Sequence, residues 1–179
     1  MKLNIIFFLG IVVLGGLSCK DSGKNQLKVE DDYFINPIFS SGSNPNALFY
    51  GGKYYYTHET NDMILLWETN DITDMGSAVC KEVWRPTDPK SMHNLWAPEI
   101  HRINDKWYIY YAADDGNTDN HQIYVLENDA RTPMEGTFKQ KGPIMTNQEW
   151  NWGIHASTFV HKGVQYLIWS GWSKRRIME

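Results

Sequence analysis

The stretch APEIHRINDKWYIYYAAD at residues 97–114 has the pattern of two strands joined by a tight turn. Aromatic and β-branched residues crowd its second half, and these residue types favour extended structure. Asn104 and Asp105 separate the two halves. A two-residue hairpin loop needs positive φ at its central positions, which Asn and Asp tolerate. The stretch therefore predicts a β-hairpin.

The same pattern occurs twice more along the chain, in NPNALFYGGKYYYTHET (44–60) and in HASTFVHKGVQYLIWSGW (155–172). The corresponding turns are Gly51-Gly52 and Lys162-Gly163. When the three turns are aligned, Asn44, Ala97 and His155 fall opposite one another, at intervals of 53 and 58 residues. The three residues are therefore predicted to occupy equivalent places in three copies of one structural unit.

A second pattern recurs between the hairpins and completes the unit. ILLWETNDITD (64–74) matches IYVLENDARTP (123–133), which aligns Glu68 with Glu127 at a spacing of 59. A unit of about four strands, recurring without a convincing amphipathic helix, is typical of a β-propeller blade. Residues 36–179 have room for two blades and the start of a third. A β-sandwich is the competing all-β fold, but it predicts no repeat of matched hairpins.

The composition excludes several function classes. The chain has 17 basic and 21 acidic residues, and its basic cluster is confined to residues 174–176, so nothing indicates binding to nucleic acid. No histidine pair has the H-x-x-x-H spacing of a zinc site, and ADDGNTDN (113–120) lacks the alternating spacing of a calcium loop. No metal and no cofactor are therefore predicted. Most of the eight Trp and ten Tyr residues are expected in the core, and exposed ones fit stacking on sugar rings.

The N-terminus predicts export. Residues 1–18 carry one charge, an apolar run and then small residues, which is the pattern of a secretory signal peptide. The sequence GLSC resembles a bacterial lipobox, which implies a lipid on Cys19; an ordinary cleaved signal is the alternative. Residues 19–35 are predicted to be a tether, so membrane contact is expected through the anchor only, at the periplasmic face or the cell surface. Cys80 then has no disulfide partner and is predicted to be a small buried apolar residue.

The stretch LWAPEIHRINDKWYIYYAADDGNTDNHQIYVLEND (95–129) resembles the second blade of glycoside hydrolase family 43. NPNALFYGGKYYYT resembles the first blade of that family and WGIHASTFVHKGVQYLIWSGW the third, so the resemblance covers residues 36–172. It implies a five-bladed β-propeller with an axial pocket, and an inverting glycosidase of arabinose-, xylose- or galactose-containing glycans. It also implies three carboxylates: an aspartate base in the first blade, an aspartate that tunes a pKa in the third, and a glutamate acid in the fourth.

Two of these three positions carry other residues in this chain. The first-blade aspartate of the family precedes a proline, and Asn44 stands there before Pro45; His155 in GIHASTF replaces the third-blade aspartate. The position of the acid lies beyond Glu179. Inverting hydrolysis needs a carboxylate that deprotonates water and a carboxylic acid that protonates the leaving oxygen. Because an asparagine amide has no basicity near neutral pH, the standard family chemistry is not expected.

Further residues are candidates for the pocket wall. Glu99 lies on the same predicted strand as the second aligned position, and family members carry an acid there; a buried structural hydrogen bond is the alternative. Trp96 and Trp152 precede matching strands, so either could stack on a sugar or pack between blades. His155 could act as a general base or acid, bind sugar hydroxyls, or serve only as part of the wall. Asn44 could bind a hydroxyl or water, or cap a turn.

The leading hypothesis is an exported lipoprotein of family 43 type, related by descent to enzymes that hydrolyse O-glycosidic bonds. Its chemistry is expected to be absent or altered, because the base and tuner positions are substituted. One rival is a non-catalytic propeller that binds an oligosaccharide or polysaccharide. Another is a truncated fragment without a stable fold, because an incomplete propeller exposes sheet edges. The sequence predicts no particular oligomeric state.

Overall fold

The computed structural model describes residues 34, 36–146 and 151–172. The predicted signal peptide, Cys19, and the predicted tether apart from Phe34 lie outside these residues. Within the described residues, no helical segment has the length and apolar character that crossing a membrane requires.

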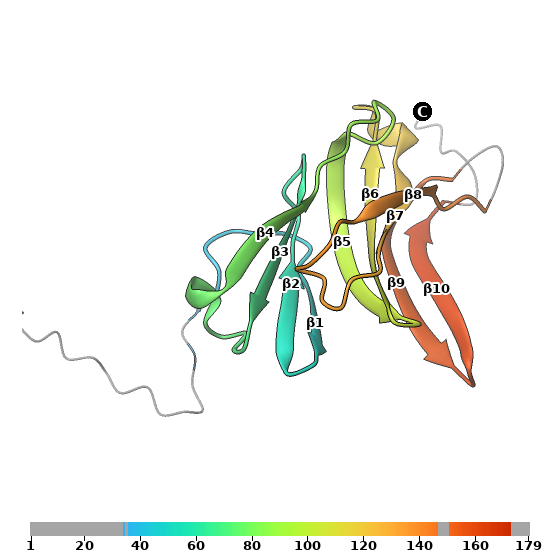
Figure 1. The fold of residues 1–179 in the computed structure, drawn as a ribbon. Helices are drawn as coiled ribbons and strands as arrows, with labels where there is room; N and C mark the ends of the chain where they lie inside the picture. The colour runs from blue at the N-terminus through green and yellow to red at the C-terminus, as the bar shows by residue number, and fades with distance from the viewer. Residues whose placement is uncertain (1–33, 35, 147–150, 173–179) are drawn as a thin grey trace, which may run out of the picture. The chain divides into compact units, whose positions relative to one another are not determined.

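The described chain forms three antiparallel sheets, which lie side by side in Figure 1. The first sheet, blade 1, has the order β1-β2-β3-β4, and the second, blade 2, has the order β5-β6-β7-β8. Strands β9 and β10 pair as a two-stranded sheet, the start of blade 3. The strand bounds are β1 Asn46–Tyr50, β2 Lys53–Thr57, β3 Ile64–Thr69, β4 Val79–Trp84, β5 His93–Ile103, β6 Lys106–Asp114, β7 Gln122–Asn128, β8 Lys139–Pro143, β9 Gly153–His161 and β10 Val164–Gly171.

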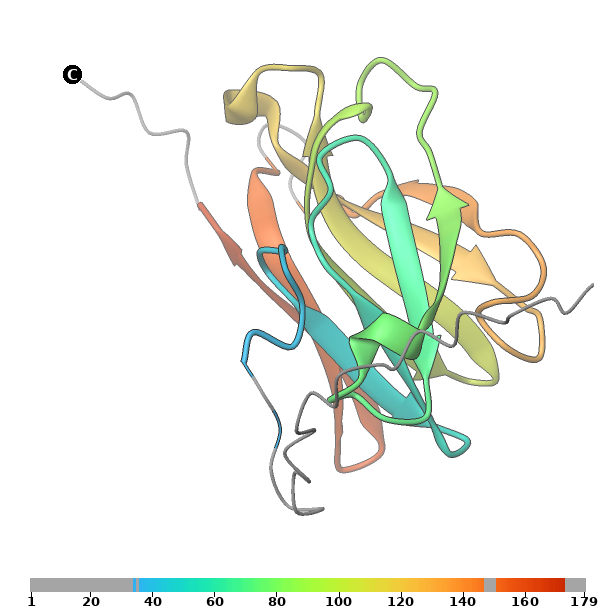
Figure 2. The ribbon, with the colours of Figure 1, turned by 90° about the vertical axis from the view of Figure 1, so that its left-hand side faces the viewer.

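The helical segments of the described chain are two single 3-10 turns, η1 (Met75–Ser77) and η2 (Thr118–Asn120). Figure 2 shows the same ribbon from the side, with the strands of each sheet twisted along their length. The predicted all-β fold, with two four-stranded units and the beginning of a third, is confirmed.

All three predicted hairpin turns have the expected geometry. Their cross-strand pairs enclose two loop residues each, since Tyr50 pairs with Lys53, Ile103 with Lys106, and His161 with Val164. Both loop residues have positive φ in every case, with 48° at Asn104 and 60° at Asp105. This is the turn that matches the twist of the flanking strands, so the local sequence sets the register of each hairpin.

The second repeated pattern also has one geometry in both complete blades. Glu68 lies opposite Tyr55 and pairs with Lys53 in blade 1. In blade 2, Glu127 lies opposite Tyr108, which donates a hydrogen bond of 2.9 Å, and it accepts one of 3.2 Å from Lys106. The alignment of Glu68 with Glu127 therefore reflects the same place in two copies of the unit.

The main core lies between blade 1 and blade 2. Trp107 on β6 is fully buried and contacts the rings of Tyr50 and Tyr55, each at 5.2 Å between centroids. The guanidinium of Arg102 lies 4.8 Å from the centre of the same ring. The other buried apolar residues of this core are Ile64, Leu66, Val83, Leu95, Ile100, Ile109, Tyr111, Ala113, Tyr124, Leu126 and Phe138.

The β9–β10 hairpin buries much less of its apolar surface. Its contacts within the described residues are with β5, β6 and β7 of blade 2. Val160 and Ile168 are 64% and 54% exposed, and the other exposed large apolar side chains of this hairpin are Phe159, Val164, Tyr166, Trp169 and, just after β10, Trp172. A two-stranded sheet covered on one face leaves its other face in solvent.

The prediction that Cys80 is a buried apolar residue is wrong. Cys80 lies on β4, the last strand of blade 1, where it pairs with Trp67, and it is exposed. Partial desolvation nevertheless raises the pKa of its thiol. Strand periodicity sets which residues share a face, but the packing of neighbouring sheets decides which face is covered.

Candidate functional site

The three aligned residues lie on or just before the innermost strands of the three sheets. Strands β1, β5 and β9 are each the first strand of their sheet, and β5 contacts both β1 and β9. Asn44, Ala97 and His155 all have left-handed backbone, with φ of 49°, 46° and 56°. This conformation costs a residue other than glycine about 1–2 kcal/mol. Its recurrence at all three places means that each innermost strand makes the same local bend.

In blades 2 and 3 the bend is a β-bulge. Ala97 and Pro98 together face one residue of β6, because Trp96 pairs with Ala112 and Glu99 with Tyr110. On β9, His155 and Ala156 likewise face the single residue Trp169 of β10. The flanking pairs are Ile154 with Ser170 and Ser157 with Ile168. A bulge of this kind re-aims the side chain at its first position and is frequent beside functional sites.

One step further along the strands, a polar layer ties the three sheets together. It consists of Asn46, Glu99 and Ser157, each two residues after an aligned position. The backbone N–H of Ile100 donates to Asn46 Oδ1 at 3.0 Å, which joins β5 to β1. Glu99 accepts a hydrogen bond from Ser157, which joins β5 to β9. Glu99 therefore has a structural role between β5 and β9, and its place in the wall of a pocket stays a prediction.

The pKa of Glu99 is lowered by its surroundings. Burial alone would raise it, but a hydrogen bond from His101 at 3.2 Å, a hydrogen bond from Ser157 and the nearby His155 together outweigh burial. Glu99 is thus stabilised in its charged form. A carboxyl whose pKa is lower in the folded than in the unfolded chain stabilises the fold above its unfolded pKa of about 4.3, and this contribution disappears as the pH falls through the folded pKa.

Glu99→Gln is expected to lower the free energy of unfolding by about 1–2 kcal/mol at pH 7, because hydrogen bonds to a charged group are lost. The difference from the unsubstituted chain should shrink below pH 4, where the carboxyl is protonated. Urea unfolding at pH 7 and at pH 3.5 measures both values. Glu82→Gln, which removes an exposed carboxylate paired with Arg85, is the matched control and should leave the free energy of unfolding nearly unchanged. An equal Glu99 effect at both pH values would contradict the assignment.

Asn44 contacts a carboxylate that the sequence analysis missed. Its Nδ2 donates to Glu59 Oε2 at 2.7 Å, and the N–H of Glu59 donates to the carbonyl of Ser43 at 3.0 Å. A signal for this pair was present: the register of the first hairpin, extended beyond Asn46 and Thr57, places Asn44 opposite Glu59. Glu59 thus places a carboxylate beside Asn44, the aligned residue that precedes β1.

A second missed feature is a buried pair behind the predicted tryptophans. Asp114 and His121 are both fully buried, and His121 Nδ1 lies 2.9 Å from Asp114 Oδ2. Asn94 Nδ2 donates to both carboxylate oxygens, and the N–H of Gly116 donates to one of them. Since a carboxylate only accepts, Nδ1 carries the proton, and Nε2 of His121 is left without a partner among the described residues. Burial lowers the pKa of His121, although Asp114 opposes this shift.

Both predicted tryptophans lie close to His121. The ring of Trp96 is 4.7 Å from that of His121, and the ring of Trp152 is 6.1 Å away. Trp152 also stacks on Trp172 at 4.3 Å with an interplanar angle of 10°, and its Nε1 donates to the carbonyl of Thr118. One face and the polar edge of Trp152 are therefore engaged within the protein, which favours its packing role; stacking on a sugar stays a prediction for both rings.

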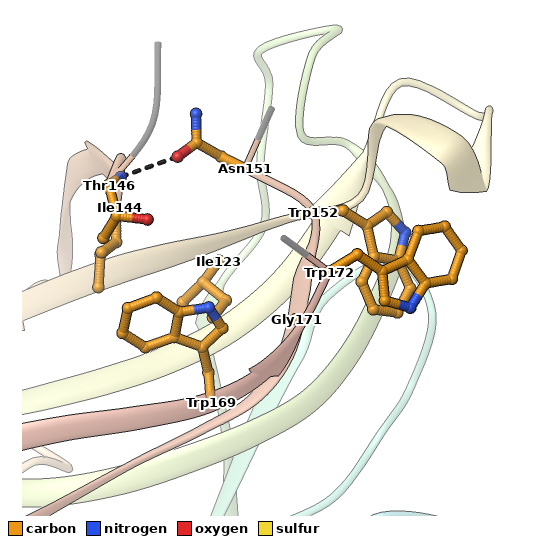
Figure 3. Close-up of a pocket in the computed structure, with 8 residues that line it drawn as sticks. All are labelled: Ile123, Ile144, Thr146, Asn151, Trp152, Trp169, Gly171 and Trp172. Carbon is orange, nitrogen blue, oxygen red and sulfur yellow. Dashed lines mark hydrogen bonds between the residues drawn. The ribbon is translucent and has the colours of Figure 1, made fainter. Parts of the chain in front are cut away.

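Trp152 lines a cavity of about 280 Å³ between β7, β8 and the β9–β10 hairpin. Figure 3 shows the indole of Trp169 beside Ile123, and Trp152 overlapping Trp172 on the other side of Gly171. The N–H of Thr146 donates to Asn151 Oδ1 at 2.8 Å across the far side of this space. The described residues that line the cavity are apolar or neutral, and none of them is an acid or a base.

The inner ends of the strands hold one useful combination of groups. Asn44 cannot accept a proton from water, whereas the adjacent Glu59 carboxylate can accept hydrogen bonds. His155 is exposed and lies close enough to Glu99 to influence its pKa. Groups that accept from hydroxyls next to half-buried aromatic rings fit the binding of a sugar.

Comparison with known proteins agrees with this architecture. The model of glycosyl hydrolases family 43 matches residues 34–179. The chain is 35% identical over 143 residues to an extracellular exo-α-(1→5)-L-arabinofuranosidase of Streptomyces chartreusis, a match that covers 76% of this chain and 43% of the relative. It is 29% identical over 141 residues to α-L-arabinofuranosidase 43 of Humicola insolens, covering 76% of this chain and 29% of the relative.

Solved structures show the same fold. A crystal structure of an α-L-arabinofuranosidase from Lactobacillus brevis superposes with a TM-score of 0.72 at 25% identity, covering 78% of this chain and 47% of that one. The endo-arabinase of Bacteroides thetaiotaomicron gives a TM-score of 0.57 at 18% identity, covering 76% and 48%. The chain thus spans less than half the length of these relatives and has part of their five-bladed β-propeller fold. On the match over residues 34–179, it belongs to glycosyl hydrolases family 43.

Proposed function

We propose that this chain binds arabinofuranosyl-containing glycans at the inner ends of β1, β5 and β9, without the inverting hydrolysis typical of its family. The observation that carries the proposal is the shared left-handed bend at Asn44, Ala97 and His155. It supports the alignment of Asn44 and His155 with the base and pKa-tuning positions, where an amide and an imidazole replace two carboxylates. The names of the relatives, which are arabinofuranosidases and arabinanases, support the sugar class.

The substitutions act on different parts of the reaction. The amide of Asn44 cannot take a proton from water, so position 44 does not supply the general base of the family's reaction. A carboxylate beside the general acid keeps that acid protonated, because two like charges resist coexisting; an imidazole does not, and its protonated form favours ionisation of the acid. Binding requires neither function. Hydroxyl acceptors and aromatic faces are sufficient for it.

The direct test is to titrate the purified chain with arabinotriose by calorimetry and to follow 4-nitrophenyl α-L-arabinofuranoside for release of nitrophenol. We expect saturable binding of the arabino-oligosaccharide, weaker binding of xylotriose, and no turnover. Trp96→Ala should weaken binding by roughly fivefold to tenfold, as expected for one lost aromatic contact. Clear turnover that His155→Ala abolishes would defeat the proposal and make His155 catalytic. Absence of binding to every arabinose-containing ligand would also defeat it.

We further propose that the protein is exported and held at the cell envelope by a lipid on Cys19. The N-terminal sequence supports export, and two relatives are named extracellular. Membrane fractionation of a Cys19→Ala variant tests the anchor.

A further inference from the structure

Glu59 differs from the other shielded carboxylates of the described chain because no lysine, arginine or histidine lies within salt-bridge distance of it, although its charge acts on His121 from further away. Its four counterparts each have a lysine or a histidine within hydrogen-bonding distance: Glu68 with Lys53, Glu99 with His101, Glu127 with Lys106, and Asp114 with His121. Glu59 is half-buried, and its partner is the neutral amide of Asn44. A carboxylate that is partly removed from water loses hydration, so it gains from any donor that replaces the lost water.

The position of Glu59 is also unusual within the repeat. Counting seven residues past each hairpin turn gives Glu59 in blade 1, Ala112 in blade 2 and Ser170 in blade 3. Small residues stand at two of the three equivalent places, and Ala112 is buried. A charged side chain at the third place is not needed by the fold of the unit. The hydrogen bond from Asn44 occupies Oε2, and Oε1 accepts no hydrogen bond within the described part of the chain.

We propose that Glu59, held in place by Asn44, is the residue that binds the hydroxyl groups of the sugar. This inference rests on the proposed function and names the group that determines specificity at that site. A carboxylate oxygen accepts charge-assisted hydrogen bonds, which are shorter and stronger than bonds between neutral groups. The ligand class is a furanosyl residue with free hydroxyls, because its O–H groups supply the donors that the uncompensated carboxylate lacks. Asn44 Oδ1 is available as a second acceptor beside it.

The identity of residue 44 follows from the same pairing. An aspartate at this place would lose the N–H donor and set two carboxylates within about 3 Å of each other. Two such groups do not both ionise near neutral pH, and the pKa of one of them rises strongly. Asparagine instead donates a hydrogen bond to Glu59 and fixes its orientation. Asn44 and Glu59 therefore form one unit, in which the first positions the second.

The test compares Glu59→Gln, Asn44→Asp and the control Asp62→Asn by calorimetry with arabinotriose and methyl α-L-arabinofuranoside. Asp62 is exposed and lies three residues after Glu59, so its removal changes the local charge without touching the pair. Glu59→Gln should weaken binding by about tenfold to hundredfold at pH 7, the range expected when a hydrogen bond to a charged group is lost. Asp62→Asn should bind within about twofold of the unsubstituted chain.

Asn44→Asp, which brings back the residue of the active family members, should weaken binding at pH 7 and recover part of it at pH 5, when the carboxylate pair takes up a proton. Tighter binding of this variant at pH 7 would overturn the proposal. If Glu59→Gln bound as tightly as the unsubstituted chain, the role of Glu59 would also be overturned, while the proposed function would stay intact. Failure of the unsubstituted chain to bind either ligand would overturn both. Circular dichroism checks that each variant is folded. Glu59→Asp keeps the charge on a side chain shorter by one methylene, and it should weaken binding less than Glu59→Gln.

Discussion

Replacing Trp107 by alanine is expected to lower the free energy of unfolding by about 3–5 kcal/mol, the cost typical of removing a large buried aromatic ring. Trp107 belongs to blade 2, and its ring contacts Tyr50 and Tyr55 of blade 1. The substitution therefore opens a cavity between two sheets rather than within one. Because a domain of this size has a total stability of about 5–15 kcal/mol, a large fraction of the variant should be unfolded at moderate temperature.

Urea unfolding followed by tryptophan fluorescence and far-ultraviolet circular dichroism measures the loss. Trp107→Phe keeps most of the volume and removes an indole N–H that has no partner among the described residues, so it should cost much less. Tyr166→Ala on the exposed β10 strand is the control for loss of an aromatic ring, with an expected change below about 1 kcal/mol. A cost for Trp107→Ala no larger than that of the control would mean that blade 1 and blade 2 do not stabilise each other through this ring.

Asp114→Ala is expected to have a similarly large effect, a loss of about 3–5 kcal/mol, because it removes one member of a buried pair. The substitution leaves His121 Nδ1, the amide of Asn94 and the N–H of Gly116 without their acceptor. His121 contacts Trp96, so the tryptophan proposed to face the sugar should also lose its fixed orientation. Binding of arabinotriose should weaken in parallel with stability.

The pH dependence of this variant has a definite sign. Burial holds the pKa of His121 below its unfolded value of about 6.5, so the neutral ring stabilises the fold above that pH, and the contribution is lost as the pH falls towards the folded pKa. Removing Asp114 takes away the main interaction that opposes the shift and leaves only the smaller effect of Glu59, so the folded pKa of His121 falls further. The difference in unfolding free energy between the variant and the unsubstituted chain should therefore grow from pH 7 to pH 5.

Denaturation at pH 7, 6 and 5, with the His121 ring protons followed by nuclear magnetic resonance, checks this prediction. Asp115→Ala, in the exposed neighbouring position, should cost far less stability than Asp114→Ala and show no such trend with pH. A cost for Asp114→Ala that decreases towards pH 5 would show that His121 is protonated in the folded chain.

Much of the fold could be predicted from the sequence because the signals act over a few residues. A pair of turn residues that tolerates positive φ fixes the loop length, and loop length fixes the register of the two strands. The spacing of three such hairpins then gives the number of units. Equivalence of Asn44, Ala97 and His155 follows from counting back from the turns, and the structure shows the same backbone bend at each.

The site was predicted less completely, because its contacts join residues from different elements. Glu59 follows β2, and its importance depends on its partial burial and on its having no salt bridge within the described residues. Asp114 ends β6 and His121 precedes β7, and both side chains are fully buried although they flank an exposed polar segment. Neither fact is encoded by a local pattern of polarity.

The sequence by itself determined the strands, the two-residue turns and the repeat, since backbone preference and hydrogen-bonded register are properties of neighbouring residues. The tertiary structure alone decided which faces are covered and which charges find partners. Cys80 is exposed, whereas Asp114 and His121 are fully buried, because burial depends on what the neighbouring elements bring within a few ångströms.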